Sequence, residues 1–176
     1  MMYSSEVEIE VSMYMTEAEK RMHRVCFTGH RPEKLTRSEH AIKADLEKKI
    51  TEAIDDGLNV FITGMARGVD IWAAQIVLKL RSKGVMIKLI CACPYEGFER
   101  SWSQKWQTQY RDILESADYV KNVCEGYSRA CFQIRNEWMV NHSSRVIAVF
   151  NGEMGGTKNT IDYASKIGVP VVRIEG

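Results

Sequence analysis

The sequence contains little proline and no long run of hydrophobic residues. Only three prolines occur in 176 residues, so no proline-rich linker divides the chain, and this length suits one domain of roughly 100–200 residues. No uninterrupted apolar stretch approaches the ~20 residues that a membrane-spanning helix needs. The first residues are acidic (Glu6, Glu8 and Glu10) rather than basic and then apolar, unlike the start of a secretory signal. We therefore expect a cytoplasmic protein with no membrane partner.

The sequence also has few cysteines and histidines and a small net charge. The five cysteines form no C-x-x-C pair, and the four histidines lack the spacing of metal ligands, so we expect reduced thiols and no metal site. The formal net charge is only +1, which disfavours a polybasic membrane or nucleic-acid binder. A role in binding single-stranded DNA would need a basic groove with stacking aromatics. We expect no nucleic-acid partner.

Strands alternate with helices along most of the chain. Short apolar runs predict strands over residues 24–28, 59–63, 85–91, 118–123, 145–150 and 170–174. Apolar spacings of three and four residues predict helices over 69–80, 99–115, 128–143 and 157–167. A further helix is expected to begin at a capping box, Thr36-Arg37-Ser38-Glu39, and to stop at Gly57. This alternation predicts an α/β fold, a single domain with a mainly parallel twisted sheet and helices on both faces.

Residues 1–22 are interpreted as an N-terminal extension, and residues 23–176 as the domain. Apolar and polar residues alternate over 6–15, which is typical of an edge strand. Thr16 and Glu19 then have the spacing of a capping box for a short helical turn. A disordered extension is an equally good interpretation, so no function is assigned to this segment.

Three glycine-rich segments follow predicted strands. They are Thr28-Gly29-His30-Arg31-Pro32, Thr63-Gly64-Met65-Ala66-Arg67-Gly68-Val69-Asp70 and Asn151-Gly152-Glu153-Met154-Gly155-Gly156-Thr157. In a parallel sheet all three emerge at the carboxyl edge, where open α/β sheets bind ligands. The second and third lead into helices, whose first turns offer unpaired N–H groups, and glycine lets a phosphate approach the backbone. Each segment alone also suits an ordinary tight turn. Together they predict a phosphate-bearing ligand, to which Thr157 can add a hydroxyl and Arg67 a planar fork.

Common nucleotide and hydrolase motifs are missing. No G-x-G-x-x-G opens a βαβ unit, and neither G-x-x-x-x-G-K-[ST] nor G-x-S-x-G occurs. These absences exclude the standard dinucleotide fingerprint, P-loop NTPases and the nucleophile elbow.

Polar residues near the glycine-rich segments have two interpretations each. Asp70 lies near a helix start, where a ribose hydroxyl or a free helix N–H is its expected partner. His30 and Arg31 follow a strand, where they contact a phosphate or base or belong to an exposed turn. Arg135 and Asn136 lie mid-helix and either face solvent or reach the ligand. Their region equally suits a dimer interface.

One aromatic stripe is open to a similar choice. Trp102, Trp106 and Tyr110 are spaced four residues apart, on one face of the helix expected over 99–115. Such a stripe is usually core, and the alternatives are an adenine platform or a surface for a protein partner. Arg100 is placed where it can reach the carboxyl edge of the sheet.

Four motifs resemble those of the YpsA family. They are residues 28–35 (Thr-Gly-His-Arg-Pro-Glu-Lys-Leu), 64–70 (Gly-Met-Ala-Arg-Gly-Val-Asp), Arg135-Asn136 with Met139-Val140, and 155–159 (Gly-Gly-Thr-Lys-Asn). This family belongs to the SLOG superfamily, with the DNA-processing protein DprA and the LOG phosphoribohydrolases. The resemblance implies a cytosolic bacterial protein with a Rossmann-like sheet that binds nucleotides or sugars such as ADP-ribose. By this resemblance Gly64, Arg67, Gly68, Gly155, Gly156 and Thr157 line the phosphate site. The full set of expected ligand-binding residues adds Thr28, Gly29, His30, Arg31, Asp70, Arg135 and Asn136.

One departure from the superfamily bears on catalysis. LOG hydrolases carry P-G-G-x-G-T-x-x-E with a catalytic Glu, but the corresponding position here is Thr160. Asp162 lies two residues further along the same helix, about 200° round it. We therefore assign no catalytic residue and expect a regulatory binding module or sensor, with a phosphoribohydrolase-type enzyme as the alternative. No cofactor is required, and the expected partners are an ADP-ribose-like or AMP-like nucleotide, a protein that reads it and a second copy of the chain.

Overall fold

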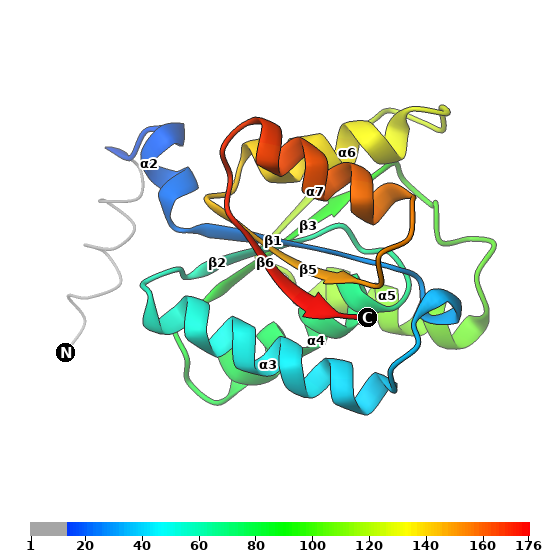
Figure 1. Ribbon diagram of the computed structural model, residues 1–176, viewed down its shortest axis with the longest axis horizontal. Helices are drawn as coiled ribbons and strands as arrows, with labels where there is room; N and C mark the ends of the chain where they lie inside the picture. Colours follow the sequence, from blue (N-terminus) through cyan, green and yellow to red (C-terminus); the bar gives the residue numbers. More distant parts are fainter. Residues whose placement is uncertain (1–13) are drawn as a thin grey trace.

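A computed structural model describes residues 14–176. Its sheet has six strands in the order β4-β3-β2-β1-β5-β6, and every neighbouring pair is parallel. The strands are β1 (Arg24–Gly29), β2 (Val60–Thr63), β3 (Lys88–Cys93), β4 (Tyr119–Asn122), β5 (Arg145–Phe150) and β6 (Val171–Glu175). The chain builds outward from β1 to β4, then returns to place β5 on the other side of β1 (Figure 1). The predicted α/β fold is confirmed.

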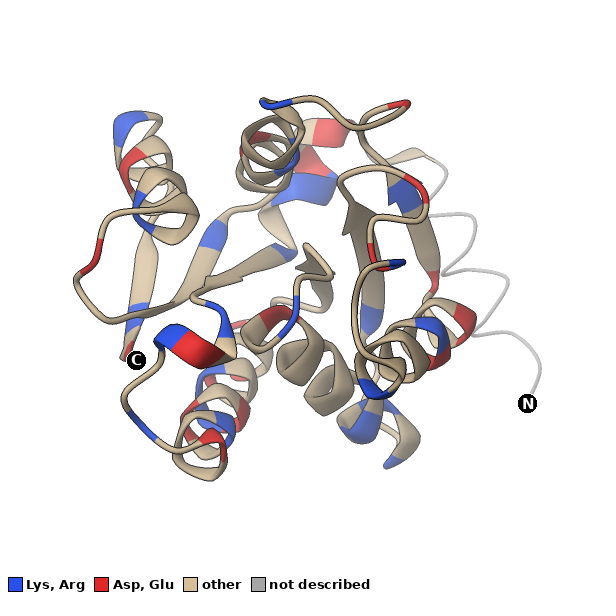
Figure 2. Cartoon of the chain, turned by 90° about the vertical axis from the view of Figure 1, so that its right-hand side faces the viewer, with Lys and Arg blue, Asp and Glu red and all other residues tan. Residues whose placement is uncertain are grey.

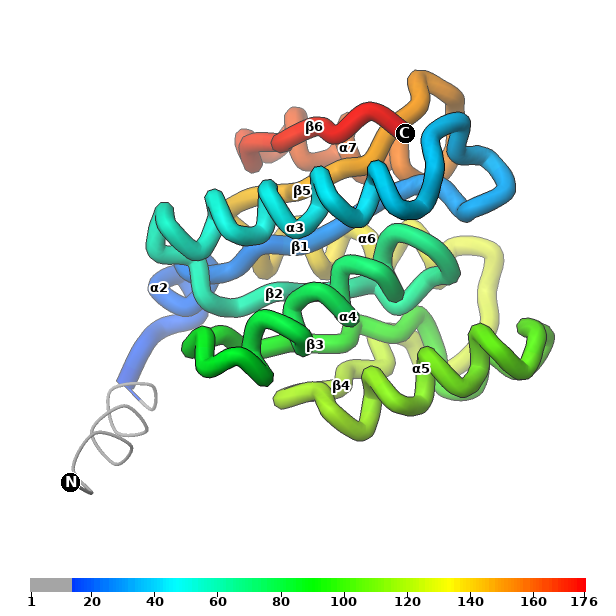
Figure 3. Tube along the Cα trace, turned by 90° about the horizontal axis from the view of Figure 1, so that it is seen from below, coloured from blue at the N-terminus to red at the C-terminus, as the bar shows by residue number. Residues whose placement is uncertain are grey.

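Helices cover both faces of the sheet, as predicted. The described helices are α2 (Glu17–Met22), α3 (Glu39–Asp55), α4 (Val69–Ser82), α5 (Gln104–Ser116), α6 (Cys131–Asn141) and α7 (Gly156–Lys166), with a 3-10 turn η1 (Pro32–Lys34). Helices α3, α4 and α5 lie on one face and α6 and α7 on the other (Figures 1 and 3). Side chains alternate along each strand, so Val25 and Phe27 join the core under α3 and α4, while Cys26 joins the core under α6 and α7.

The start of α3 differs from the prediction. Ser38, not Thr36, is the N-cap, and its side chain accepts a hydrogen bond from the Ala41 N–H at 3.2 Å. The Thr36 hydroxyl instead donates to the carbonyl oxygen of Gly176 at 2.7 Å. The capping box at Thr36 was wrong because a contact with the far end of the chain takes its hydroxyl. The predicted stop at Gly57 is confirmed, with a φ of 87°.

Two helices are shorter than predicted. Helix α5 begins at Gln104 rather than at residue 99, and α6 spans Cys131–Asn141 rather than 128–143. Residues 96–101 form turns before α5, and directly after them Trp102 packs edge-on against Phe98 and Tyr110, with ring centroids 5.0 and 5.7 Å away. Aromatic packing therefore holds this segment in turns that local helical spacing did not indicate.

The N-terminal segment contacts the domain through α2. Thr16 and Glu19 form the predicted capping box. The guanidinium of Arg21 donates to the carbonyl oxygen of Ser143 at 2.9 Å. Of the edge strand expected over 6–15, residues 6–13 lie outside the described part of the chain, and residues 14 and 15 are not in a strand. Among the described helices, none combines the length and apolar character needed to cross a membrane.

Candidate functional site

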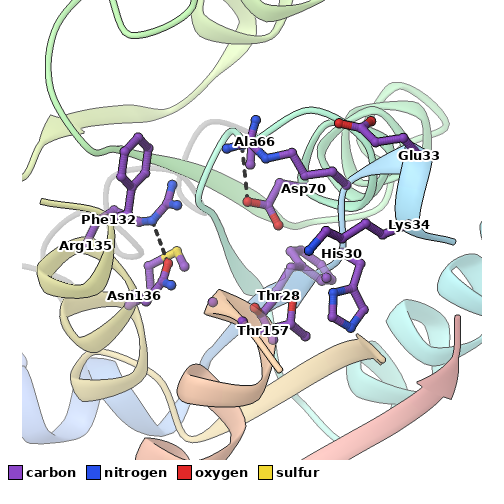
Figure 4. Close-up of a pocket in the computed structure, with 16 residues that line it drawn as sticks. Thr28, His30, Glu33, Lys34, Ala66, Asp70, Phe132, Arg135, Asn136 and Thr157 are labelled. Carbon is purple, nitrogen blue, oxygen red and sulfur yellow. Dashed lines mark hydrogen bonds between the residues drawn. The ribbon is translucent and has the colours of Figure 1, made fainter. Parts of the chain in front are cut away.

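A cavity of about 270 Å³ opens at the carboxyl edge of the sheet, beside the ends of β1 and β5 (Figure 4). The strand order reverses between these two strands, and such a point is where open α/β sheets bind ligands. Ten of the residues expected to bind the ligand line this cavity: Thr28, Gly29, His30, Arg31, Asp70, Arg135, Asn136, Gly155, Gly156 and Thr157. Segments separated by more than 120 residues of sequence thus meet in one place.

Three expected residues do not line the cavity. Gly68 is the N-cap of α4 and lies against Pro32, whose Cδ would be 2.8 Å from a Cβ at this glycine. The Arg67 guanidinium forms an ion pair with Glu33 at 2.9 Å, so it is not free to bind a phosphate in the cavity. Gly64 lies under the Arg135 side chain. The first two contacts fasten the loop after β2 to the loop after β1, and the third fastens it to α6.

Arg135 is buried and joins α6 to the loop after β2. Its Nε donates to the side-chain oxygen of Asn136 at 2.8 Å, and its Nη1 donates to the carbonyl oxygen of Gly64. Both side chains are under 10% exposed, so the solvent-facing interpretation was wrong, and neither is available for a dimer surface. Burial lowers the pKa of Arg135, while nearby Asp70 opposes that shift.

The carboxylate of Asp70 lines the cavity, and only one of its two oxygens has a hydrogen-bond donor. Its Oδ2 accepts a hydrogen bond from the Ala66 N–H at 3.2 Å, while its Oδ1 is buried without a partner. Burial raises the pKa of Asp70, opposed by the positive charge of Arg135 and by the Ala66 N–H. The side chain is only 5% exposed. The observed partner is therefore an N–H of the loop before α4 rather than the free helix N–H that was expected, and it occupies one oxygen only.

His30 carries the second unpaired polar atom of the cavity. Its ring stacks on Phe150 with centroids 5.5 Å apart, and its Nε2 is buried without a partner. Burial lowers the pKa of His30 below its usual value, so the ring is neutral near pH 7. The interpretation of His30 as an exposed turn residue was wrong, because the residue is only 5% exposed.

The N-terminus of α7 is open, whereas that of α4 is not. Gly155 is the N-cap of α7, and no side chain caps this helix or places a carboxylate in its first turn. Two residues after the N-cap comes Thr157 in α7, while the same position in α4 is Asp70. A helix N-terminus attracts negative charge. In α4 the carboxylate of Asp70 supplies this negative charge. The N-terminus of α7 has no such carboxylate and is free to bind an external anion.

Most of the chain matches a known protein family. The YpsA family, described as the YspA SLOG family, matches residues 25–167. The chain belongs to the YpsA family. The SPbeta prophage-derived protein YoqJ of Bacillus subtilis is 36% identical over 118 residues, covering 60% of this chain and 69% of YoqJ. A UPF0398 protein of Bacillus thuringiensis is 28% identical over 150 residues, covering 81% of this chain and 82% of that protein.

Two solved structures of DprA share the Rossmann-like fold of this YpsA-family chain. The Streptococcus pneumoniae protein superposes with a TM-score of 0.64 at 22% identity, over 88% of this chain and 51% of that one. The Helicobacter pylori protein, described for its single-stranded DNA binding mode, gives 0.62 at 20% identity, over 91% of this chain and 68% of that one. This chain thus spans about half of the pneumococcal protein, and the likeness concerns the fold.

The residues compared with the LOG catalytic position lie outside the cavity. Thr160 is 1% exposed, and its hydroxyl donates to the carbonyl oxygen of Gly156 at 2.8 Å. Asp162 is exposed on the outer face of α7, where it pairs with Lys158. Among the described cavity-lining residues, the carboxylates are Asp70 and Glu33.

The aromatic stripe belongs to the core. Tyr110 is buried and its hydroxyl donates to the Cys93 Sγ at 3.0 Å, while Trp102 and Trp106 pack against the same core. None of the three lines the cavity, and the exposed side chain of Arg100 does not line it either. The adenine-platform interpretation of this stripe finds no support in the structure.

Six cavity-lining residues were not predicted. They are Phe27, Glu33, Lys34, Ala66, Phe132 and Met139. Phe132 and Met139 precede and follow Arg135 and Asn136 at spacings of three residues, so all four share one face of α6. That spacing was available in the sequence as a signal. Which face of α6 turned toward the ligand edge was not, because it depends on how the helix packs.

Proposed function

We propose that this YpsA-family protein binds a nucleotide or a nucleotide-derived sugar, of the AMP or ADP-ribose type, and acts in the cytoplasm as a regulatory sensor. One observation carries the proposal: two buried unpaired polar atoms, Asp70 Oδ1 and His30 Nε2, belong to residues of one cavity that also has an uncapped helix N-terminus. Buried polar groups in folded proteins nearly always have partners. A polar ligand in this cavity would supply both.

The phosphate is assigned to the N-terminus of α7. Gly156 leaves open space where a side chain would stand, since an added Cβ would meet only the Asn136 Nδ2, at 3.8 Å. Backbone N–H groups of the first turn can therefore be approached closely, and Thr157 adds a hydroxyl. Arg31 and Lys34 line the same cavity and supply positive charge.

The base is assigned to the apolar wall made by Phe132 and Met139 of α6. An aromatic ring and a thioether both pack well against a flat π-system. Both basic and acidic residues occur around the carboxyl edge, which faces the viewer in Figure 2. That mixture suits a small nucleotide held inside a cavity better than a long nucleic acid lying across the surface.

A retained or added nucleotide tests the proposal directly. We expect native mass spectrometry of the freshly purified protein to reveal a bound nucleotide, or AMP or ADP-ribose to raise the unfolding temperature. Ligand at 100 times its dissociation constant adds about 2.7 kcal/mol of stability. An empty mass spectrum together with no thermal shift from either compound would overturn the proposal, as would a gel shift of single-stranded DNA as the sole binding detected.

A pair of glycine variants separates binding from folding. Gly156→Ala adds a methyl group where the structure has room for it, so the protein should fold normally but admit a phosphate less closely. Gly126→Ala is the matched control, because a Cβ there meets nothing within 4 Å and the residue does not line the cavity. We expect the first variant to lose nucleotide affinity and the second to keep it.

A phosphoribohydrolase is the second candidate. The observation in its favour is that Asp70 places a buried carboxyl in the cavity, although Thr160 stands where LOG hydrolases have their Glu. Release of free adenine from AMP or ADP-ribose, measured by chromatography and lost in Asp70→Asn, would establish this activity. Nucleotide binding without any release of adenine would exclude the hydrolase and support the sensor.

A further inference from the structure

The two oxygens of the Asp70 carboxylate have different surroundings. Oδ2 accepts the Ala66 N–H, whereas Oδ1 is buried and unpartnered. Arg135 is the cation that acts most strongly on Asp70, but it does not pair with Oδ1. Its guanidinium donates to Asn136 and Gly64, and it forms no ion pair with Asp70 within 4.0 Å. Burying a carboxylate oxygen without a partner is unfavourable. A bound ligand can bring the missing partner.

The chemistry of that partner is restricted. An ionised carboxylate only accepts hydrogen bonds, so a phosphate or another carboxylate cannot satisfy it. A hydroxyl group suits Asp70 in either protonation state, because a hydroxyl can donate to the ionised form and accept from the protonated form. A ligand hydroxyl is the partner that fits Oδ1 best.

The position of Asp70 in the cavity indicates which hydroxyl group of the ligand it meets. Figure 4 shows the carboxylate pointing in among the cavity-lining side chains, with Phe132 and Thr157 in different directions from it. Those two residues belong to the wall assigned to the base and to the terminus assigned to the phosphate. In a nucleotide the ribose lies between base and phosphate, and its hydroxyls are the donors there.

We infer that Asp70 recognises the ribose hydroxyls of the ligand, so that the protein selects ribonucleotides over deoxyribonucleotides. This inference rests on the proposed function and narrows it to one sugar class. A site built to hydrogen-bond a hydroxyl rejects the analogue that lacks it, because the buried protein group is then left unpaired. Loss of one hydrogen bond to a charged group corresponds to roughly 10- to 100-fold in affinity.

Calorimetric titration with AMP, 2′-deoxy-AMP and 3′-deoxy-AMP tests the inference. We expect at least one of the deoxy compounds to bind the wild-type protein about 10-fold or more weakly than AMP. Equal binding of all three would overturn the inference and leave the proposed function standing. Binding of none of them, nor of ADP-ribose, would overturn the proposed function itself.

Variants of Asp70 show whether this side chain is responsible. In Asp70→Ala the preference for AMP over the deoxy compounds should disappear. Asp70→Asn, which keeps the shape and one acceptor oxygen, serves if the alanine variant folds poorly, and its preference should be reduced. Asp162→Asn is the control, since this exposed residue pairs with Lys158 outside the cavity, and it should keep the full preference. A preference that survives in both Asp70 variants would overturn the assignment.

Discussion

The guanidinium of Arg135 donates a hydrogen bond to the main-chain carbonyl oxygen of Gly64, 71 residues earlier in the chain. This contact ties α6 on one face of the sheet to the loop that leads into α4 on the other. It also holds a buried positive charge near Asp70 without forming an ion pair with it. The shape of the cavity at this point therefore depends on one side chain.

Replacing Arg135 should destabilise the protein. Arg135→Met leaves the buried oxygens of Gly64 and Asn136 without their donor, at a cost of about 1–3 kcal/mol for each buried group left unpaired. Urea unfolding should show a lower midpoint with an unchanged slope. Arg129→Met, an exposed arginine in the loop before α6, is the control and should unfold like the wild type. Equal midpoints for both variants would contradict the structural role of Arg135.

Gly64→Ala should damage the site, in contrast to Gly156→Ala. A Cβ at Gly64 would lie 2.6 Å from the Arg135 Nη1 and 2.8 Å from the Asp70 Oδ2, so these buried side chains would have to shift and give up their hydrogen bonds to Gly64 and Ala66. We expect lower stability together with weaker nucleotide binding, measured by thermal unfolding and calorimetry. If Gly64→Ala unfolds and binds nucleotide like the wild type, Gly64, Arg135 and Asp70 are not packed as closely as the structure indicates.

Asp70 should make stability depend on pH. Burial raises the pKa of Asp70 in the folded protein above the ordinary aspartate value of 3.8. At pH values just above 3.8 the folded state therefore holds a proton that the unfolded state has lost. Stability therefore falls as pH rises through this window. The unfolding free energy of the wild type minus that of Asp70→Asn should decrease from pH 4 upward. The lowered pKa of His30 makes stability rise with pH, and the subtraction removes this contribution because both proteins contain His30. A difference that rises with pH would contradict a raised pKa for Asp70.

The thiols should differ sharply in reactivity. Burial raises the pKa of Cys26 to about 12 and also raises the pKa values of Cys91 and Cys93, so these thiols are neutral and inaccessible at pH 8. Cys131 is buried as well, whereas Cys124 is partly exposed. Ellman's reagent should therefore label one thiol quickly in the native protein and all five after denaturation. Fast labelling of the native protein should disappear in Cys124→Ser; if it persists there, a buried thiol is more accessible than the structure indicates.

The alternation of strands and helices, and the place of the glycine-rich loops, could be predicted from local pattern. Periods of two and 3.6 residues are properties of short segments, so they predicted all six strands and the approximate extent of the helices between them. Parallel pairing then brought the loops after β1 and β5 to one edge, as expected. Ten of the thirteen expected ligand residues line one cavity for this reason.

Predictions failed where a residue's partner comes from a distant part of the chain. Thr36 has the spacing of a helix cap, yet its hydroxyl meets Gly176, and Ser38 caps the helix instead. Arg67 has the charge and position to bind a phosphate, yet it pairs with Glu33 of the preceding loop. Local spacing carries no information about such competing partners.

The order of residues by itself determined which segments become strands and helices, and that their glycine-rich connections lie at one edge, because backbone geometry and hydrophobic periodicity act over a few residues. Tertiary packing alone decided the order of the strands, the burial of Arg135 and the separate surroundings of the two Asp70 oxygens. Desolvation is the physical reason, since the cost of burying a polar atom, and the partner that offsets it, depend on every segment packed around that atom.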